Sequence, residues 1–325
     1  MTIYNYSNYT TFAIKSDGER YILTGFNLFT LLSSLIGDST ILVGSLNYKA
    51  FKLHKMIEAT IQHLAVCDIL FSITTVLPSV ISILTNKWIF GEVLCYFRAH
   101  SGYLLGVTEW LLISLMTTGK LLVLKFPLRA GIVSIKQCHL LCSAAWITAL
   151  VTPVTYLLVD KEDVLFDYRT YVCIYGFSAE IWSWLKPLLS VFLSILPNIV
   201  VIVTTVMLLL EAKRIARRGR ESLRWQGIIT VILTAGVFCL SVIPYTVYLI
   251  AAPYVMEEPP GPFHINYFRV AACSLQFNIL CNFYIYSLTL TSFRKFLRER
   301  STVVAACLSF RSPDPSINVA LSTRV

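Results

Sequence analysis

The stretch "TTGKLLVLKFPLRA", residues 117–130, joins the end of a long apolar segment to a basic, proline-broken loop. The apolar segment begins near residue 94, and one lysine, Lys120, stands close to its end. A helix of about 20 predominantly apolar residues crosses the hydrocarbon core of a bilayer. Lysine and arginine accumulate in the loops on its cytoplasmic side. The stretch therefore predicts the inner end of a transmembrane helix.

The whole chain has the composition of a membrane protein. Hydrophobic residues make up 56% of it and charged residues only 14%, and the mean hydropathy is +0.68, values outside the range of ordinary soluble domains. Seven segments are long enough to span a bilayer: 21–48, 57–84, 94–123, 140–159, 184–210, 228–252 and 265–290. They predict an all-α fold, a single bundle of seven continuous transmembrane helices. Residues 1–20 form an N-terminal segment, 21–290 the transmembrane domain and 291–325 the tail.

Charged residues orient this bundle. The basic residues gather in one alternating set of loops and in the tail, at Lys49, Lys52, Lys55, Lys125, Arg129, Lys136, Lys213, Arg214, Arg217, Arg218, Arg220, Arg224, Arg294, Lys295, Arg298 and Arg300. By the positive-inside rule these loops are cytoplasmic and the N-terminus is extracellular, which predicts a multi-pass protein of the plasma membrane. The net charge of +9 then reflects topology and contact with an anionic lipid bilayer, and it is no evidence for nucleic-acid binding.

Both termini carry modification or docking motifs. Asn5 and Asn8 begin N-x-[ST] glycosylation sequons, which agrees with an extracellular N-terminus. In the tail, Phe293, Phe296 and Leu297 have helical spacing between basic residues, so a short amphipathic helix is expected to lie flat on the inner leaflet. Cys307 beyond it is either a palmitoylation site or a plain cytosolic thiol. The ending "STRV" fits a PDZ-domain ligand, although so short a motif also arises by chance.

Motifs scattered over the spans carry a family resemblance. They are "LAVCD" at 64–68, "WIFG" at 88–91 ahead of Cys95, Trp146, Pro197, "FCLSVIP" at 238–244 and "NFYIY" at 282–286. From about residue 37 to 297 the chain resembles a rhodopsin-like (class A) G-protein-coupled receptor. The resemblance implies a non-enzymatic receptor that binds an extracellular ligand and signals to a heterotrimeric G protein. It also implies a disulfide between Cys95 and Cys173, both on the predicted outer side.

Lys120 stands where this family has the arginine of an acid-arginine-tyrosine triplet, and Gly119 replaces the acid. The resemblance implies a role for Lys120 in G-protein coupling, although lysine lacks the planar fork of arginine. The alternative is a lysine that extends its ammonium to the lipid headgroups. Counting back from Pro244 places Arg224 where the family has an acid. A like charge there predicts a weak closed-state clasp.

Other positions of the family's activation route are partly kept. Phe238, Pro244 and Tyr286 remain and are expected to form the switch with Lys120. The departures are Ser241-Val242-Ile243 before Pro244, Phe283 in place of a proline and Thr205 in place of a tyrosine. Phe283 restores a backbone N–H that proline lacks. These departures put efficient G-protein activation in question.

Three acids lie near the middle of the first three spans: Asp38, Asp68 and Glu109. Asn278 and Asn282 of the seventh span are expected to join them. A charge at the bilayer centre costs about 3 kcal/mol or more on insertion scales, so the acids must share protons or a cation. The resemblance points to sodium, with these five residues as a cation site. A protonated, hydrogen-bonded network without an ion is the alternative, and no other cofactor is expected.

Ligand class is the least determined property. Gly102 occupies the place of the aspartate in amine receptors, and the last span has no lysine to bind retinal. The candidate pocket residues near the mouth are Arg98, Gly102, Tyr103, Lys186, Arg269 and Gln276. Basic groups at span ends are often interfacial anchors. If at least two point inward, an acidic ligand is expected.

Other protein classes fit less well. The five histidines are scattered over several spans, which disfavours a zinc hydrolase. No repeat or broken mid-membrane helix indicates a transporter. The remaining alternative is a protein with the receptor fold that binds ligand or scaffolds partners without efficient G-protein activation.

Overall fold

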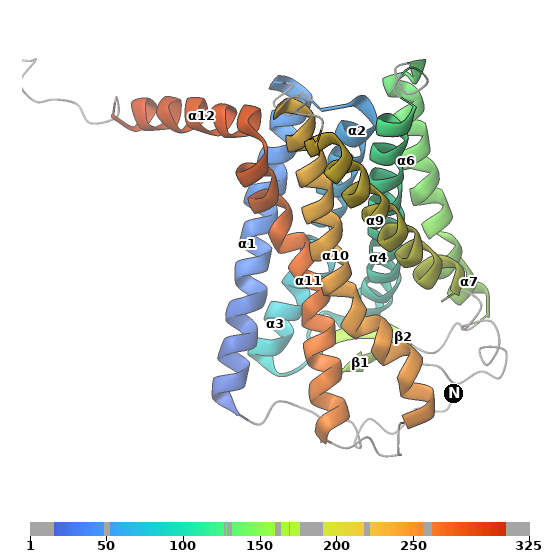
Figure 1. Ribbon diagram of the computed structural model, residues 1–325. Coiled ribbons are helices and arrows are strands. Elements are labelled where there is room, and N and C mark those ends of the chain that lie inside the picture. Colours follow the sequence, from blue (N-terminus) through green and yellow to red (C-terminus); the bar gives the residue numbers. More distant parts are fainter. Residues whose placement is uncertain are drawn as a thin grey trace, which may run out of the picture.

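The computed structural model describes residues 16–48, 53–126, 128, 132–159, 164–168, 170–175, 191–217, 222–255 and 262–309. Within this part, long helices form one upright bundle (Figure 1). A small hairpin lies at the end of the bundle that was predicted to be extracellular, and helix α12 leaves the opposite end sideways.

All seven predicted spans are helical where they are described. The first is α1 (Asp17–Tyr48); the second is α2 (Lys55–Phe71), the π-turn η3 (Ser72–Val76) and α3 (Leu77–Thr85); the third is α4 (Gly91–Lys125); the fourth is α6 (Ile135–Ala149) and α7 (Val151–Val159); the fifth is η4 (Val191–Ile195) and α9 (Leu196–Arg217); the sixth is α10 (Ser222–Val255); and the seventh is α11 (Pro262–Thr289). Helix α12 (Thr291–Ser309) follows. Residues 184–190 of the predicted fifth span lie outside the described part.

Six of these spans are long and apolar enough to cross a membrane by length and composition alone, counted over the described residues. Helix α11 is less apolar because it carries amides such as Gln276, Asn278 and Asn282. It nevertheless packs along α10 and α1 inside the bundle. Its polar side chains therefore face protein, and it is the seventh helix.

Helix α4 is the central element. It packs against α2, α6, α9 and α10 and reaches the hairpin at its outer end. Hydroxyl groups tie it to the fifth span: Ser114 donates to the Pro197 carbonyl at 3.0 Å, and Thr204 donates to Thr117 at 2.8 Å. Side chains of α4 that face the bundle interior can therefore contact several of the other spans.

The fourth span is not one continuous helix, so the expectation of unbroken spans is wrong there. Helix α6 ends at Ala149, Leu150 forms a turn, and α7 begins at Val151. Pro153 explains the break, because it has no N–H to donate to the carbonyl of Ala149 and its ring crowds that turn.

The loop after the fourth span contains a two-stranded antiparallel sheet that was not predicted. Strand β1 (Val164–Asp167) pairs with β2 (Val172–Tyr175), with Phe166 opposite Cys173. This is the one sheet in the described part of the chain, and it leaves the helical bundle itself as predicted.

Helix α12 has basic and apolar faces, as expected, but its phenylalanines do not face lipid. Phe293 is fully buried and Phe296 nearly so, and their rings lie against Gly44 of α1. Phe283 joins this contact: its ring lies 6.2 Å from that of Phe293. The rings thus pack on α1 and α11, and the expectation that α12 lies flat on the inner leaflet stays a prediction. α11 itself continues unbroken past Phe283.

Candidate functional site

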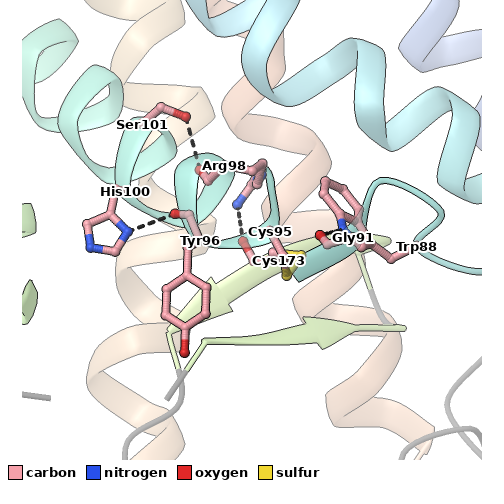
Figure 2. Close-up of a disulfide and its surroundings, with 8 residues drawn as sticks. All are labelled: Trp88, Gly91, Cys95, Tyr96, Arg98, His100, Ser101 and Cys173. Atoms are coloured by element: carbon pink, nitrogen blue, oxygen red, sulfur yellow. Dashed lines mark hydrogen bonds between the residues drawn. A yellow bond between two sulfur atoms is a disulfide. The ribbon is translucent and has the colours of Figure 1, made fainter. Parts of the chain in front are cut away.

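The outer end of the bundle is organised by a disulfide. Cys95, in the second turn of α4, is bonded to Cys173 of β2, with their Cα atoms 5.3 Å apart. Figure 2 shows the bond between the strand and the helix. The predicted pair is confirmed, and it holds the hairpin across the mouth of the bundle.

A second contact fixes the hairpin to α3. The Tyr171 hydroxyl donates to Oδ1 of Asn86 at 2.7 Å. Both residues have left-handed backbones, with φ of 55° and 53°, a conformation that is uncommon for non-glycine residues. Tyr171 is fully buried and packs with Ile83 and Phe166. The hairpin is therefore a packed part of the receptor mouth.

Arg98 lies directly under this hairpin. Its Nη1 donates to the carbonyl of Cys173 at 2.6 Å, as Figure 2 shows. Its Nε is buried and has no hydrogen-bond partner among the described residues. A Cβ on Gly102, one turn along α4, would lie 3.4 Å from Nη1. The glycine therefore leaves space beside the guanidinium. Tyr103 and Tyr245 lie close enough to interact with its charge.

The guanidinium also has an acid of the hairpin near it. Asp167, the last residue of β1, interacts electrostatically with Arg98 and is 4% exposed. Arginine has five N–H donors in a fixed fork. One is used by Cys173, and a buried donor without a partner is costly. The guanidinium can therefore take a further hydrogen-bond acceptor, next to the negative charge that Asp167 supplies.

The other predicted pocket residues are engaged between helices. Arg269 of α11 lies 3.9 Å from the Glu19 carboxylate of α1. The Gln276 amide donates to Oδ1 of Asn27 at 3.1 Å. Both contacts join α1 to α11 at the mouth. Lys186 lies outside the described residues, so its predicted place in a pocket stays a prediction.

The predicted acidic cluster exists, but its members are paired rather than gathered on one point. Asp68 accepts from Asn282 at 2.7 Å, and Glu109 accepts from Asn278. Asp38 instead accepts from Ser34 on its own helix at 2.6 Å. Over the described residues, no three histidine, cysteine, aspartate or glutamate side chains are placed to hold one metal ion.

Several buried oxygens of this cluster have no hydrogen-bond partner in the part of the chain that the structure describes. They are Oδ1 of Asp38, Asp68, Asn278 and Asn282. The four residues are each 1% exposed. As hydrogen-bonding atoms, carboxylate and amide oxygens are acceptors, so a cation or a proton suits them better than another acceptor. The two acid–amide pairs, with Asp38 close enough to interact electrostatically with both acids, form this buried polar cluster.

At the inner end, Lys120 is buried, with 7% of its side chain exposed. A Cβ on Gly227 of α10 would lie 2.8 Å from its Nζ. The ammonium therefore lies at the backbone of α10. The side chain of Arg224, one turn earlier on α10, is outside the described part, so the like-charge contact stays a prediction.

Gly119 has a structural role of its own. A Cβ there would lie 2.8 Å from Cγ of Met56, so α2 fills the space that an acid would need. The Met56 side chain packs against α4 at Gly119, and the Lys120 side chain packs against α10 at Gly227. We refer to these two contacts as the glycine notches.

A group of polar contacts, which sequence reasoning missed, joins the inner end of α10 to the end of α11 and the start of α12. Thr230 donates to Thr289 at 2.7 Å, and Thr291 donates to Oε1 of Gln226 at 3.1 Å. We refer to these four residues as the inner clasp. The spacing of Gln226 and Thr230, one turn apart on α10, was the available signal.

The predicted switch residues on α10 and α11 all lie farther from the inner end than the inner clasp. Phe238 and Tyr286 are buried, at 0% and 1% exposed, and both belong to the main core. The carbonyl of Pro244 accepts from the Tyr267 hydroxyl at 3.1 Å. Asn5, Asn8 and the C-terminal motif lie outside the described residues, as does the side chain of Cys307.

The fold and these sites can be compared with known proteins. The sequence profile of the family described as "7 transmembrane receptor (rhodopsin family)" matches residues 39–288. The chain belongs to this family. It is accordingly a multi-pass membrane receptor and not an enzyme.

Individual relatives are distant. Lysophosphatidic acid receptor 4 of Homo sapiens is 22% identical over 298 residues, which cover 87% of this chain and 78% of that receptor. Succinate receptor 1 of Rattus norvegicus is 25% identical over 189 residues, covering 54% and 58% of the two chains. Melanopsin of Phodopus sungorus is 30% identical over 135 residues, covering 41% and 28%. The last two matches span less than two thirds of those relatives.

Proposed function

We propose that this rhodopsin-family receptor acts at the cell surface and binds an extracellular ligand with an acidic group, for which Arg98 is the main contact. One observation supports this most directly: the guanidinium lies partly buried under the hairpin with its Nε unpartnered. Tyr103 and Tyr245 near it provide hydroxyl groups that also bond to a carboxylate or phosphate.

The names of two relatives agree with this ligand class. Succinate and lysophosphatidic acid are both anions, the first a dicarboxylate and the second a phosphate ester. Bidentate contact with a planar guanidinium suits either group. The similarity to melanopsin does not support retinal as a ligand of this chain, because α11 contains no lysine to bind it.

Ligand binding under the hairpin reaches the G-protein side through α4. This helix carries Arg98 at its outer end and Lys120 at its inner end. We infer that a heterotrimeric G protein engages the inner ends of α4 and α10 when they separate. The alternative, a receptor that binds ligand without efficient activation, is favoured by Gly119, since the family's acid is missing.

Thermal unfolding with two probe ligands tests the ligand proposal. Succinate and lysophosphatidic acid are added separately to the purified receptor, to Arg98→Ala and to Arg20→Ala. Arg20 is a control because it pairs with Asp17 at the start of α1. An anion that stabilises the wild type and Arg20→Ala, but not Arg98→Ala, supports the site. Equal stabilisation of all three proteins contradicts it.

Nucleotide exchange separates the two functional readings. Purified receptor is mixed with individual heterotrimeric G proteins, with and without the stabilising anion. Accelerated exchange supports a signalling receptor. A receptor that binds the anion and leaves exchange at the G-protein-only rate supports the non-activating alternative.

A cation in the core is a second proposal. Sodium would be held by Asp68, Glu109, Asn278 and Asn282, whose unpartnered oxygens suit a cation. When bound it would neutralise buried negative charge and stabilise the closed bundle. Thermal stability should rise with sodium and not with equal concentrations of choline. If Asp68→Asn shows the same rise, sodium does not bind there.

The remaining proposals concern the ends of the chain. Plasma-membrane location with an extracellular N-terminus predicts glycans at Asn5 and Asn8. A cytoplasmic tail predicts lipidation at Cys307 and binding of a PDZ domain to Val325. Deglycosylation shifts, palmitate exchange and pull-down with and without Val325 test these in turn, and an unchanged result in any of them removes that proposal.

A further inference from the structure

Two histidines meet where the second span packs against the fourth. The ring centroids of His63 on α2 and His139 on α6 lie 5.4 Å apart, and Nε2 of His63 lies 3.2 Å from Nδ1 of His139. On the other side of His63, the indole Nε1 of Trp146 on α6 donates to Nδ1 at 3.2 Å. All three rings are half-buried. They form a hydrogen-bonded chain between the two helices, which we call the histidine chain.

The indole fixes the position of each proton in this chain. Tryptophan can only donate, and a neutral imidazole has one donor and one acceptor nitrogen. Because Nδ1 of His63 accepts from Trp146, its Nε2 carries the proton and donates to Nδ1 of His139. His139 then carries its own proton on Nε2. Both hydrogen bonds are satisfied only while both histidines are neutral.

An added proton cannot be accommodated without loss. If it binds to Nδ1 of His139, two N–H groups face each other between the histidines. If the proton of His63 moves to Nδ1 to relieve this contact, that N–H faces the N–H of Trp146 instead. One added proton therefore breaks at least one of the two hydrogen bonds. A second proton adds repulsion between two cations.

The surroundings of the pair contain no stronger polar link. The hydroxyl of Thr60 on α2 lies 3.8 Å from Sγ of Cys142 on α6, but a thiol is a weak hydrogen-bonding group. Of the described residues, His139 is the one whose charge acts on His63. The other ionisable side chains on the inner parts of the helices around the pair are Asp38, Lys55, Glu58, Cys67, Asp68, Glu109, Lys120, Lys125, Lys136, Cys138 and Cys142.

We propose that the histidine chain is a proton-sensitive contact, which joins α6 to α2 while both histidines are neutral and opens when the pair takes up one proton. Histidine is the side chain that ordinarily titrates between about pH 5 and 8. The unfolded chain binds protons at both residues in this range, whereas the folded pair must break a bond to do so. The contact thus contributes its full stability at neutral pH and loses it on acidification. This inference depends neither on the ligand nor on G-protein activation.

A double-mutant cycle at two pH values tests the contact. Thermal unfolding is measured for the wild type, His63→Phe, His139→Phe and the double variant, because phenylalanine keeps a ring and removes its nitrogens. At about pH 7.5 the double variant should lose roughly 2–4 °C less in Tm than the sum of the two single losses. At about pH 5.5, below the ordinary histidine range, this difference should disappear. The same difference at both pH values, or none at the higher one, overturns the proposal.

His100→Phe is the matched control for this cycle. His100 lies at the outer end of α4, where its Nδ1 bonds to the carbonyl of Tyr96 at 2.7 Å. Combined with His139→Phe, it should give additive losses at both pH values, since distant sites usually add. A pH-dependent coupling between these two residues as well would show a general effect of acid and overturn the specific contact.

NMR of the wild type with labelled histidine nitrogens needs no variant. An N–H···N bond between two imidazoles produces a scalar coupling between their nitrogens. Among the described histidines, His63 and His139 are the one pair within hydrogen-bond distance. We expect this coupling in neutral buffer and its loss in acidic buffer. Its absence in neutral buffer, or its persistence in acid, overturns the proposal.

Zinc distinguishes a proton contact from a metal site. A metal ion between the rings needs a lone pair on both facing nitrogens, so the proton of His63 would have to move against the N–H of Trp146. Zinc added at neutral pH should therefore change the Tm of the wild type and of the double variant equally. A rise confined to the wild type shows a metal site and overturns the proton contact.

Discussion

The outer and inner ends of this receptor are held together by different kinds of contact. At the outer end a covalent bond joins Cys95 to Cys173, and Tyr171 and Arg98 add directional hydrogen bonds to the hairpin. At the inner end the helices meet through the two glycine notches and the inner clasp. A disulfide contributes several kcal/mol, whereas a neutral hydrogen bond contributes about 1 kcal/mol net.

The difference shows which end of the bundle can open. Ligand binding at a fixed outer end can move the inner ends of α4 and α10 only if their mutual contacts cost little to break. The glycine notches and the hydroxyl pairs of the inner clasp meet that condition. The chain has the cysteine pair that the family resemblance implies at the outer end, and it departs from the family's triplet at Gly119 and Lys120 at the inner end.

Removing the disulfide should have the largest effect. Cys95→Ala is expected to lower the free energy of unfolding by about 2–5 kcal/mol, because it frees a long loop in the unfolded chain. Thermal unfolding of the purified receptor measures this. Cys239→Ala is the control, since Cys239 is a partly exposed free thiol of α10. Equal stability of the two variants would mean that the outer end does not depend on its covalent bond.

Restoring the family's acid should be the next most damaging change. Gly119→Asp places a side chain where Met56 lies, and overpacking of this kind costs about 1–3 kcal/mol. Met56→Ala removes the obstacle and should recover part of the loss in the double variant. Unfolding of the two single variants and the double variant gives the coupling. Simple additivity of the two losses would show that Met56 and residue 119 do not share space.

The large features of this comparison were readable from the sequence because they depend on local patterns. Apolar length predicts the seven spans, and loop charges predict their direction. The family resemblance added the disulfide between Cys95 and Cys173, which the structure contains. The break in the fourth span was also within reach, since Pro153 stands inside it.

The glycine notches were not readable from the sequence, because they depend on which faces of distant segments meet. Nothing in the sequence around Gly119 indicates that Met56 of another helix fills its place. Likewise the acids were expected at one point, but Asp38 pairs with Ser34 on its own helix. Phe293 and Phe296 have the spacing of a lipid-facing surface, and that spacing does not tell lipid from the side of α1.

Breaking the inner clasp should have a moderate effect. Thr230→Val with Thr289→Val removes one hydroxyl pair, worth about 1 kcal/mol. The closed state loses that contact, so the fraction of receptor with α10 displaced from α4 should rise several-fold. Distances between spin labels on these helices measure it. Thr148→Val is the control, because Thr148 bonds only to Ala144 of its own helix in the described contacts. If the double variant and Thr148→Val give the same distance distribution, the inner clasp does not hold the closed state.

The smallest effect is expected where Lys120 meets Gly227. A Cβ at residue 227 would lie 2.8 Å from Nζ, but the ammonium ends a flexible chain and can move aside. Gly227→Ala should therefore weaken the closed state by less than the roughly 1–3 kcal/mol of rigid overpacking. Gly236→Ala is the matched control, because a Cβ at 236 meets nothing within 4 Å.

Arginine in place of Lys120 should also weaken the closed state, and by more than Gly227→Ala does. The guanidinium is wider than an ammonium and planar, so Lys120→Arg cannot be accommodated against Gly227 without moving α10. It also supplies the fork that a G protein contacts in this family. Lys120→Arg should thus raise both the open fraction and the rate of nucleotide exchange, while Gly227→Ala should raise only the open fraction slightly. If the distance distribution of Gly227→Ala equals that of Gly236→Ala and Lys120→Arg leaves exchange unchanged, Lys120 does not participate in closing the receptor.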